Sequence, residues 1–146
     1  MKAMAGLGRT VGAALVALPT LAMATDTPAT LADRITGNTL SAVIFLPPGS
    51  GTGSTRLQRI FLQAHLRSDG HALMRVWQPD RNAYSAVEER VWRVRDDVLC
   101  LDIPRQASAA LCFNAHVWGP RIAGTGTRPY ALLDGDIAAG NTLTSP

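Results

Sequence analysis

Short apolar runs follow one another along the chain after residue 37, and glycine, proline, aspartate and asparagine separate them. Short runs bounded by turn residues are typical of β-strands. We therefore expect strands at 41–46, 59–66, 71–78, 89–95, 98–103 and 109–114, and shorter ones at 117–118 and 130–133. Many short strands at this spacing predict an all-β fold, mainly an antiparallel small barrel or sandwich.

One short N-terminal helix is expected before the first strand. Thr27 is a suitable N-cap, and Pro28 fits the first helical position, where its missing N–H is not needed. Leu31 and Ile35 are four residues apart and would lie on one face of the helix. Gly37 can end the helix in the left-handed conformation.

Turn residues predict how the strands are connected. The Asp69-Gly70 pair lies between two apolar runs and indicates a hairpin, and the two aspartates at 96–97 indicate another turn. Segments rich in proline, glycine or asparagine at 47–54 and 79–84 predict exposed loops. The many glycines after residue 118 predict that the last strands are short and broken.

The tetrapeptide Gly-Asn-Thr-Leu occurs at 37–40 and again at 140–143. Four residues are too few to indicate a duplicated domain. We interpret both copies as similar turns that lead into strands near the two ends of the fold.

The two cysteines, Cys100 and Cys112, fall in neighbouring predicted strands. If they lie opposite each other in an antiparallel pair, three further apolar pairs also match: Leu99 with Phe113, Leu101 with Leu111, and Ile103 with Ala109. A register shift of one residue would lose this agreement. We therefore predict a disulfide on the less apolar face of the hairpin. A metal site is less well supported, because further ligands are missing nearby. A redox-active pair is less well supported, because there is no C-x-x-C motif. A catalytic thiolate would need a reduced cysteine with an activating partner.

Residues 1–24 have the layout of a secretory signal peptide. Lys2 and Arg9 form a basic start, and the segment 11–21 is apolar. This apolar segment is too short to cross a bilayer comfortably. We therefore expect the chain to be exported.

Ala22 and Ala24 provide the small-x-small pattern of a signal cleavage site, with Thr25 as the first residue of the exported chain. Export would place a single β-rich domain, 25–146, in the periplasm or outside the cell, where a disulfide can form. No stable membrane anchor is predicted, because no cysteine follows the cleavage site and no second long apolar run occurs.

Charge removes some function classes from consideration. The full chain has 14 basic and 11 acidic residues, and two of the basic residues belong to the predicted signal peptide. The exported chain would carry 12 arginines, no lysine and 11 acidic residues. This nearly equal number of positive and negative side chains does not indicate binding to nucleic acid or to an anionic membrane. The arginine bias is typical of a GC-rich bacterial genome, and a dedicated arginine-lined anion site is the alternative.

His65 and His71 flank the predicted hairpin turn and could approach each other, with Asp69 as a third ligand. Imidazole and carboxylate groups suit Zn²⁺, so these residues are a candidate metal site. Their spacing matches no established signature, and two half-exposed histidines beside a turn are the simpler interpretation. A small metal-dependent hydrolase that uses His65, His71 and Asp69 is therefore an alternative function.

Other catalytic patterns are missing from the sequence. There is no G-x-S-x-G elbow, and the glycine-rich segment 49–53 lacks the lysine and the helix pattern of a phosphate-binding loop. Trp77, Trp92 and Trp118 are expected to pack in the core, and a stacked-ligand role is the alternative for one of them. No cofactor and no catalytic residue are predicted.

The layout of the chain resembles a family of small uncharacterised secreted bacterial proteins with a β-rich domain. The shared elements are a short helix before Gly37-Asn38-Thr39, an Asp69-Gly70 turn, a strand around Trp92, the Cys100 and Cys112 pair, and a closing Gly140-Asn141. The resemblance covers most of residues 30–143, but Glu89-Arg90 stands where the family commonly has a glycine before the tryptophan strand. It implies a compact exported β domain and brings no catalytic residues.

We therefore expect an exported, non-enzymatic binding or accessory protein of the bacterial cell envelope. Its partner would be another protein, an envelope component or a small ligand, and not a nucleic acid. An inhibitor of a secreted enzyme that presents the 47–54 or 79–84 loop is a further alternative. An internal cavity would favour small-molecule binding, whereas a packed interior would favour recognition at the surface.

Overall fold

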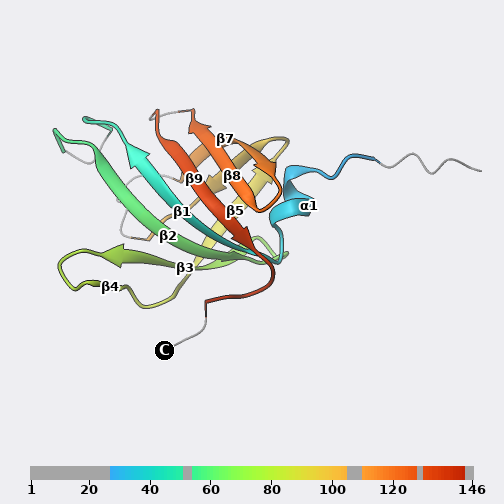
Figure 1. Ribbon diagram of the computed structural model, residues 1–146, viewed down its shortest axis with the longest axis horizontal. Coiled ribbons are helices and arrows are strands. Elements are labelled where there is room, and N and C mark those ends of the chain that lie inside the picture. The colour runs from blue at the N-terminus through green and yellow to red at the C-terminus, as the bar shows by residue number, and fades with distance from the viewer. Residues whose placement is uncertain (1–26, 51–53, 105–109, 128–129, 144–146) are drawn as a thin grey trace, which may run out of the picture.

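The computed structural model describes residues 27–50, 54–104, 110–127 and 130–143. Within these ranges one helix, α1 (Leu31–Ile35), precedes nine strands. In chain order the strands are β1 (Thr39–Leu46), β2 (Gln58–Leu66), β3 (His71–Gln78), β4 (Ala83–Tyr84), β5 (Glu88–Arg95), β6 (Val98–Leu101), β7 (Leu111–Trp118), β8 (Arg121–Gly126) and β9 (Leu132–Ala138). Figure 1 shows the strands wrapped into one body, with α1 at one end.

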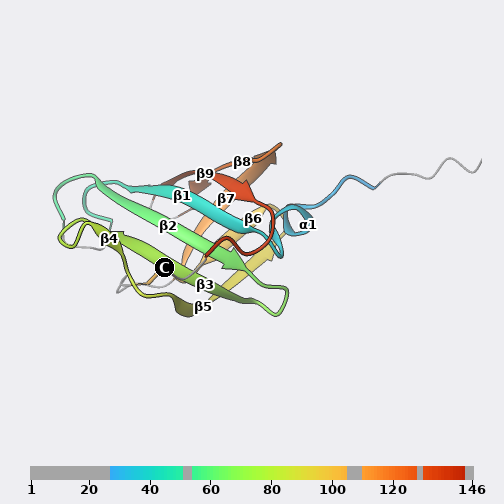
Figure 2. The same ribbon diagram turned by 60° about the horizontal axis from the view of Figure 1, so that its bottom comes forward.

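Eight of the described strands close into an antiparallel barrel. Each ring strand pairs with the next ring strand along the chain, and β3 pairs with β5 because β4 lies outside the ring. Pairing of β1 with β9 closes the ring. The short strand β4 pairs with β3 outside the ring. Figure 2 shows β3 and β5 on the side of the barrel below β1 and β2. The predicted all-β class with one short helix is confirmed, and the architecture is the barrel.

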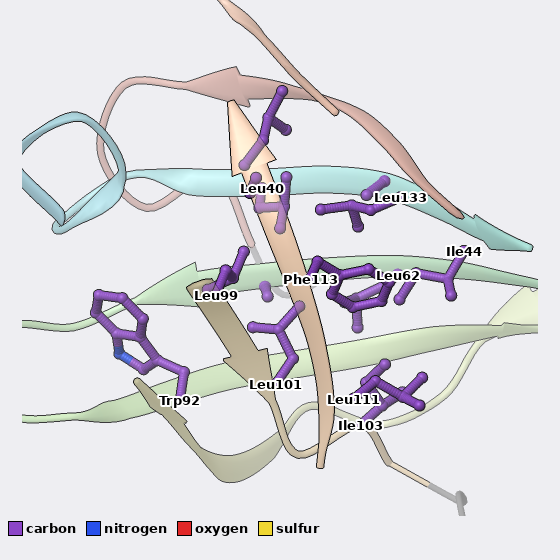
Figure 3. Close-up of a cluster of buried hydrophobic side chains, with 14 of the residues drawn as sticks. Leu40, Ile44, Leu62, Trp92, Leu99, Leu101, Ile103, Leu111, Phe113 and Leu133 are labelled. Carbon is purple, nitrogen blue, oxygen red and sulfur yellow. The ribbon is translucent and has the colours of Figure 1, made fainter. Parts of the chain in front are cut away.

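Alternation of side chains along the strands fills the interior. In β1, for example, Leu40 and Ile44 point inward and are almost completely buried. Inward residues of all eight ring strands and of α1 form one contiguous cluster, with Phe113 of β7 fully buried within it. Figure 3 shows this side chain among leucines and isoleucines from the surrounding strands. An eight-stranded barrel is narrow enough for side chains to fill it, and these residues form a packed core.

Helix α1 covers one end of the barrel and begins later than the sequence indicates. Thr30, not the predicted Thr27, is the N-cap, because its Oγ1 accepts a hydrogen bond from the Asp33 N–H at 3.2 Å. The Asp33 carboxylate in turn accepts a hydrogen bond from the Thr30 N–H at 2.9 Å, which is the main cause of its lowered pKa. Leu31 and Ile35 face the core, as predicted.

The cysteine hairpin has the predicted register. Cys100 of β6 and Cys112 of β7 lie directly opposite each other, with a Cα–Cα distance of 4.0 Å, and form a disulfide. Leu99 faces Phe113, and Leu101 faces Leu111; all four are buried in the barrel. The disulfide therefore lies on the outer face and joins neighbouring strands, as predicted. The third predicted pair involves Ala109, which lies outside the described residues.

The last three strands differ most from the prediction. β7 continues beyond its predicted end, and β8 is a regular strand where glycines indicated breaks. Gly124 and Gly126 of β8 face the interior beside Phe113. A Cβ on Gly124 would lie 2.9 Å from the carbonyl oxygen of Asn114 and 3.0 Å from the Cβ of Phe113. Gly124 therefore allows β8 to approach the backbone of β7 closely, and it does not end the strand.

Replacing Gly135 with alanine should lower the free energy of unfolding by about 3 kcal/mol, at the upper end of typical overpacking costs. Its Cβ would lie 2.5 Å from the Ser41 carbonyl oxygen and 2.7 Å from the Ala42 Cβ, where β9 meets β1. Urea denaturation would measure the change. Gly140→Ala is the matched control, since a Cβ there meets nothing within 4 Å and costs about 1 kcal/mol for its positive φ. Equal losses in the two variants would contradict the steric explanation.

The two Gly-Asn-Thr-Leu segments meet in the fold. Asn38 Oδ1 accepts a hydrogen bond from the Gly140 N–H at 3.2 Å, and Thr39 Oγ1 accepts one from the Thr142 N–H at 3.0 Å. The first copy leads into β1, as predicted. For the second copy the prediction of a turn into a strand is wrong, since 141–143 form no strand and instead lie against the first copy.

The predicted signal peptide, with the cleavage residues Ala22, Ala24 and Thr25, lies outside the described residues. The described part of the predicted domain 25–146 forms one barrel around one hydrophobic cluster. Among the helices of this part, none is long and apolar enough to cross a membrane.

Candidate functional site

A groove with a volume of about 500 Å³ lies on the outer face of the barrel over β7, β8 and β9, whose adjacent positions can be followed in Figure 1. Its floor is the outer face of β8, and its walls come from β7 on one side and from β9 and β1 on the other. The outward-facing residues that line it are Phe45, Asn114, His116, Trp118, Ala123, Thr125, Leu132 and Asp134. We call this surface the β8 groove.

The strand register explains why a groove forms on a convex barrel surface. His116, Ala123 and Asp134 lie directly opposite one another on β7, β8 and β9. The next row repeats the arrangement with Thr125 in the middle. Outward side chains on neighbouring strands stand side by side. Small side chains on β8 between larger ones on both neighbours therefore leave a depression.

Two large apolar side chains at the β8 groove are strongly exposed. Trp118 and Leu132 each expose 53% of their surface. Trp118 is the last residue of β7 and lies opposite Arg121, across the turn formed by Gly119 and Pro120. Exposed aromatic groups beside polar ones are typical of binding surfaces, because the ring offers a rigid apolar face.

Arg121 lies beside the groove and forms ion pairs with two aspartates of β9. Its guanidinium nitrogens contact the carboxylate of Asp134 at 2.6 Å and that of Asp136 at 3.2 Å. All three side chains are substantially exposed, so the ion pairs contribute little stability. Their effect is positional: the Asp134 carboxylate is held at the groove wall, and its charge is balanced by a neighbouring cation.

The predicted metal trio is only partly brought together. The Asp69 carboxylate accepts a hydrogen bond from the His71 N–H at 3.0 Å, and its other oxygen contacts the Arg67 guanidinium at 2.5 Å. The first contact is the main cause of the lowered pKa of Asp69, and Arg67 contributes to it. His65 has a buried Nδ1 with no hydrogen-bond partner among the described residues. Those residues contain no group of three His, Cys, Asp or Glu side chains placed to hold a metal ion.

The three tryptophans have different environments. Trp92 is buried in the barrel, as predicted, and its Nε1 donates to the backbone oxygen of Arg67 at 2.9 Å. Trp77 lies on the outer face of β3, half-buried, in an edge-to-face contact with Tyr84 at a centroid distance of 5.2 Å. Trp118 is exposed at the β8 groove, so the prediction that it packs in the core is wrong. Its position at a strand end next to a turn explains the exposure.

Sequence reasoning missed most of the groove because it placed the end of β7 at Asn114. Had the alternation that begins at Leu111 been followed further, Asn114, His116 and Trp118 would have fallen together on the polar face of one strand. For β9 the sequence indicated only the short strand 130–133, and nothing local predicted its continuation to Ala138. Asp134 and Gly135 indicate a turn in isolation, and their strand forms because β1 and β8 flank it.

The chain was compared with protein-family models, with curated proteins and with solved structures, and none of the three comparisons gave a match.

Proposed function

We propose that this protein is an exported, non-enzymatic binding protein of the cell envelope and that the β8 groove is its ligand site. The observation that carries the proposal is that the fold has room for a ligand on its outer surface and not in its interior. Buried side chains fill the barrel interior, whereas a groove of about 500 Å³ with an exposed tryptophan lies on the outside. This volume is within the usual range of ligand sites.

The spacing of the polar groups favours binding over catalysis. His116 and Asp134 share a register row but have Ala123 between them, so their strands are about 10 Å apart. A catalytic acid–base pair needs groups within hydrogen-bond distance of each other or of one reacting atom. Side chains distributed along both walls instead suit a ligand that contacts each wall separately.

The disulfide and the sequence layout support the place of action. Cys100 and Cys112 form a bond that is typical of oxidising compartments, and residues 1–24 have the pattern of a secretory signal. We therefore propose a periplasmic or secreted location. In that setting an envelope component is the preferred partner, because the groove lies on an open outer surface.

Replacing Trp118 with alanine should weaken binding to a washed bacterial envelope fraction at least tenfold, as measured by co-sedimentation of the purified protein. The exposed indole is the largest apolar surface in the β8 groove, and large buried aromatics dominate binding energies once a ligand covers them. The fold should be preserved, because the removed side chain is more than half exposed.

Val91→Ala is the matched control for this experiment. Val91 also exposes 53% of its surface on a strand of the ring, but it lies on β5, away from the groove. The control variant should sediment like the original protein. Equal loss in both variants, or an original protein that does not sediment with the envelope fraction, would overturn the proposed function.

A further inference from the structure

We infer that the ligand of the β8 groove is a neutral saccharide, with one pyranose ring stacked on Trp118. This inference rests on the proposed function and adds the chemical class of the ligand. Three features of the groove support it: the exposed indole, the kind of polar groups beside it, and the local balance of charge.

The indole of Trp118 is a large, exposed aromatic group in the wall of the groove. It exposes 53% of its surface, although it belongs to a regular strand of the ring. The face of a pyranose ring carries C–H groups and is weakly apolar, while its rim carries hydroxyl groups. An aromatic side chain that combines a broad apolar face with nearby polar groups matches both parts of such a ligand.

The polar side chains around the indole suit hydroxyl groups. Asn114 and His116 lie on the same wall as Trp118, Thr125 on the floor and Asp134 on the opposite wall. An amide and a hydroxyl can each donate and accept, and a carboxylate accepts, which together match the mixed character of a sugar hydroxyl. Asp134 is held in place by Arg121 at 2.6 Å, so this acceptor is already oriented before a ligand arrives.

The charge around the groove favours a neutral ligand. Arg121 balances Asp134, and Asp136 adds a second carboxylate at 3.2 Å from the same guanidinium. Among the described residues, no arginine or lysine side chain lines the groove itself. Two carboxylates beside one guanidinium leave a net negative charge next to the groove, which opposes an anionic saccharide.

A peptide strand is less suitable as a ligand because the groove has no free sheet edge. β8 pairs with β7 on one side and with β9 on the other along its length. Extended peptides gain most of their affinity by adding a strand to an unpaired edge. At the β8 groove a ligand must instead bind through side chains, which is the mode available to a sugar.

The inference can be tested by titrating the isotopically labelled protein with neutral oligosaccharides and following backbone amide signals by NMR. The probes are tetramers of N-acetylglucosamine, of β-1,4-linked glucose and of α-1,4-linked glucose. A tetramer of galacturonic acid and an extended apolar heptapeptide are the comparison ligands. At least one neutral tetramer should shift the amides of β7, β8 and β9, whereas the anionic tetramer and the peptide should not.

Three variants separate stacking from general damage to the surface. Trp118→Ala should weaken saccharide binding at least tenfold, Trp118→Phe should recover part of the loss because phenylalanine keeps an aromatic face, and Thr125→Val should weaken binding a few-fold through the lost hydroxyl. Val91→Ala should bind like the original protein. Shifts that are independent of residue 118, or that appear equally with the galacturonic acid tetramer, would overturn the inference.

Failure of the inference can be distinguished from failure of the proposed function. If co-sedimentation with the envelope fraction depends on Trp118 but none of the neutral tetramers binds or competes, the ligand class is wrong and the binding function stands. The same conclusion holds if the apolar peptide binds in place of the sugars. If co-sedimentation does not depend on the groove, both proposals fall.

Discussion

Replacing Phe113 with alanine should lower the free energy of unfolding by about 4 kcal/mol, in the usual range for buried phenylalanine. The side chain is fully buried, and it is the largest in the set of completely buried core residues. Gly126 lies directly opposite it on β8, and a glycine has no side chain with which to fill the space that the ring would leave. The cavity should therefore remain largely open. Urea denaturation followed by far-ultraviolet circular dichroism would measure the loss.

Phe61→Ala is the control for this prediction. Phe61 lies on the outer face of β2 and exposes 41% of its surface, so the same truncation there removes much less buried area. We expect a loss of about 1 kcal/mol, within the range of ordinary surface substitutions and partial burial. If Phe113→Ala costs no more than Phe61→Ala, the packed interior described for this barrel is wrong. Such a result would also make the barrel interior a candidate ligand site.

Removal of the disulfide should cost about 3 kcal/mol, because the bond closes a short loop and restricts the unfolded chain. The double variant Cys100→Ala with Cys112→Ala removes it without leaving a free thiol. The two residues are 12 positions apart in the sequence, which places the expected effect at the lower end of the range for native disulfides. Comparison of urea midpoints would give the change, since the slope of the transition should alter only modestly.

The reduced form of the original protein provides the internal control. Addition of a phosphine reductant should destabilise the original protein about as much as the double substitution does, and it should leave the double variant unchanged. The folded barrel should survive both changes, because the flanking Leu99–Phe113 and Leu101–Leu111 pairs remain buried. Equal stability of the oxidised and reduced forms would contradict the proposed contribution of the disulfide.

The filled interior is also the reason that we propose a ligand site on the outside of this barrel. An eight-stranded barrel either packs its inward side chains against one another or leaves room for one small ligand. Here Phe113 and the surrounding aliphatic side chains occupy that space. A ligand site then needs concavity elsewhere, and a strand with small outward residues such as Ala123 supplies it between two strands with larger ones.

Local sequence patterns were sufficient for the first five ring strands. His71–Gln78 was predicted with its correct limits, and β1, β2 and β5 were predicted within two residues. Trp92 of β5 packs in the core, as expected from the sequence. These elements carry enough apolar residues at period two that their burial follows from their own composition. The short strand β4 was missed because its two residues pair through tertiary contact with β3.

The amino-acid sequence by itself determined the all-β class, the strand limits of the first half and the register of the disulfide hairpin. These features depend on neighbouring residues, since alternation and turn chemistry act over a few positions. Tertiary structure alone decided β8, the continuation of β9 beyond the predicted strand 130–133, and the β8 groove. Gly124 and Gly135 read locally as breaks, but closure of the ring pairs them on both sides and uses their missing side chains for close packing. The groove exists because three strands place His116, Ala123 and Asp134 in one row, and no local pattern encodes that alignment.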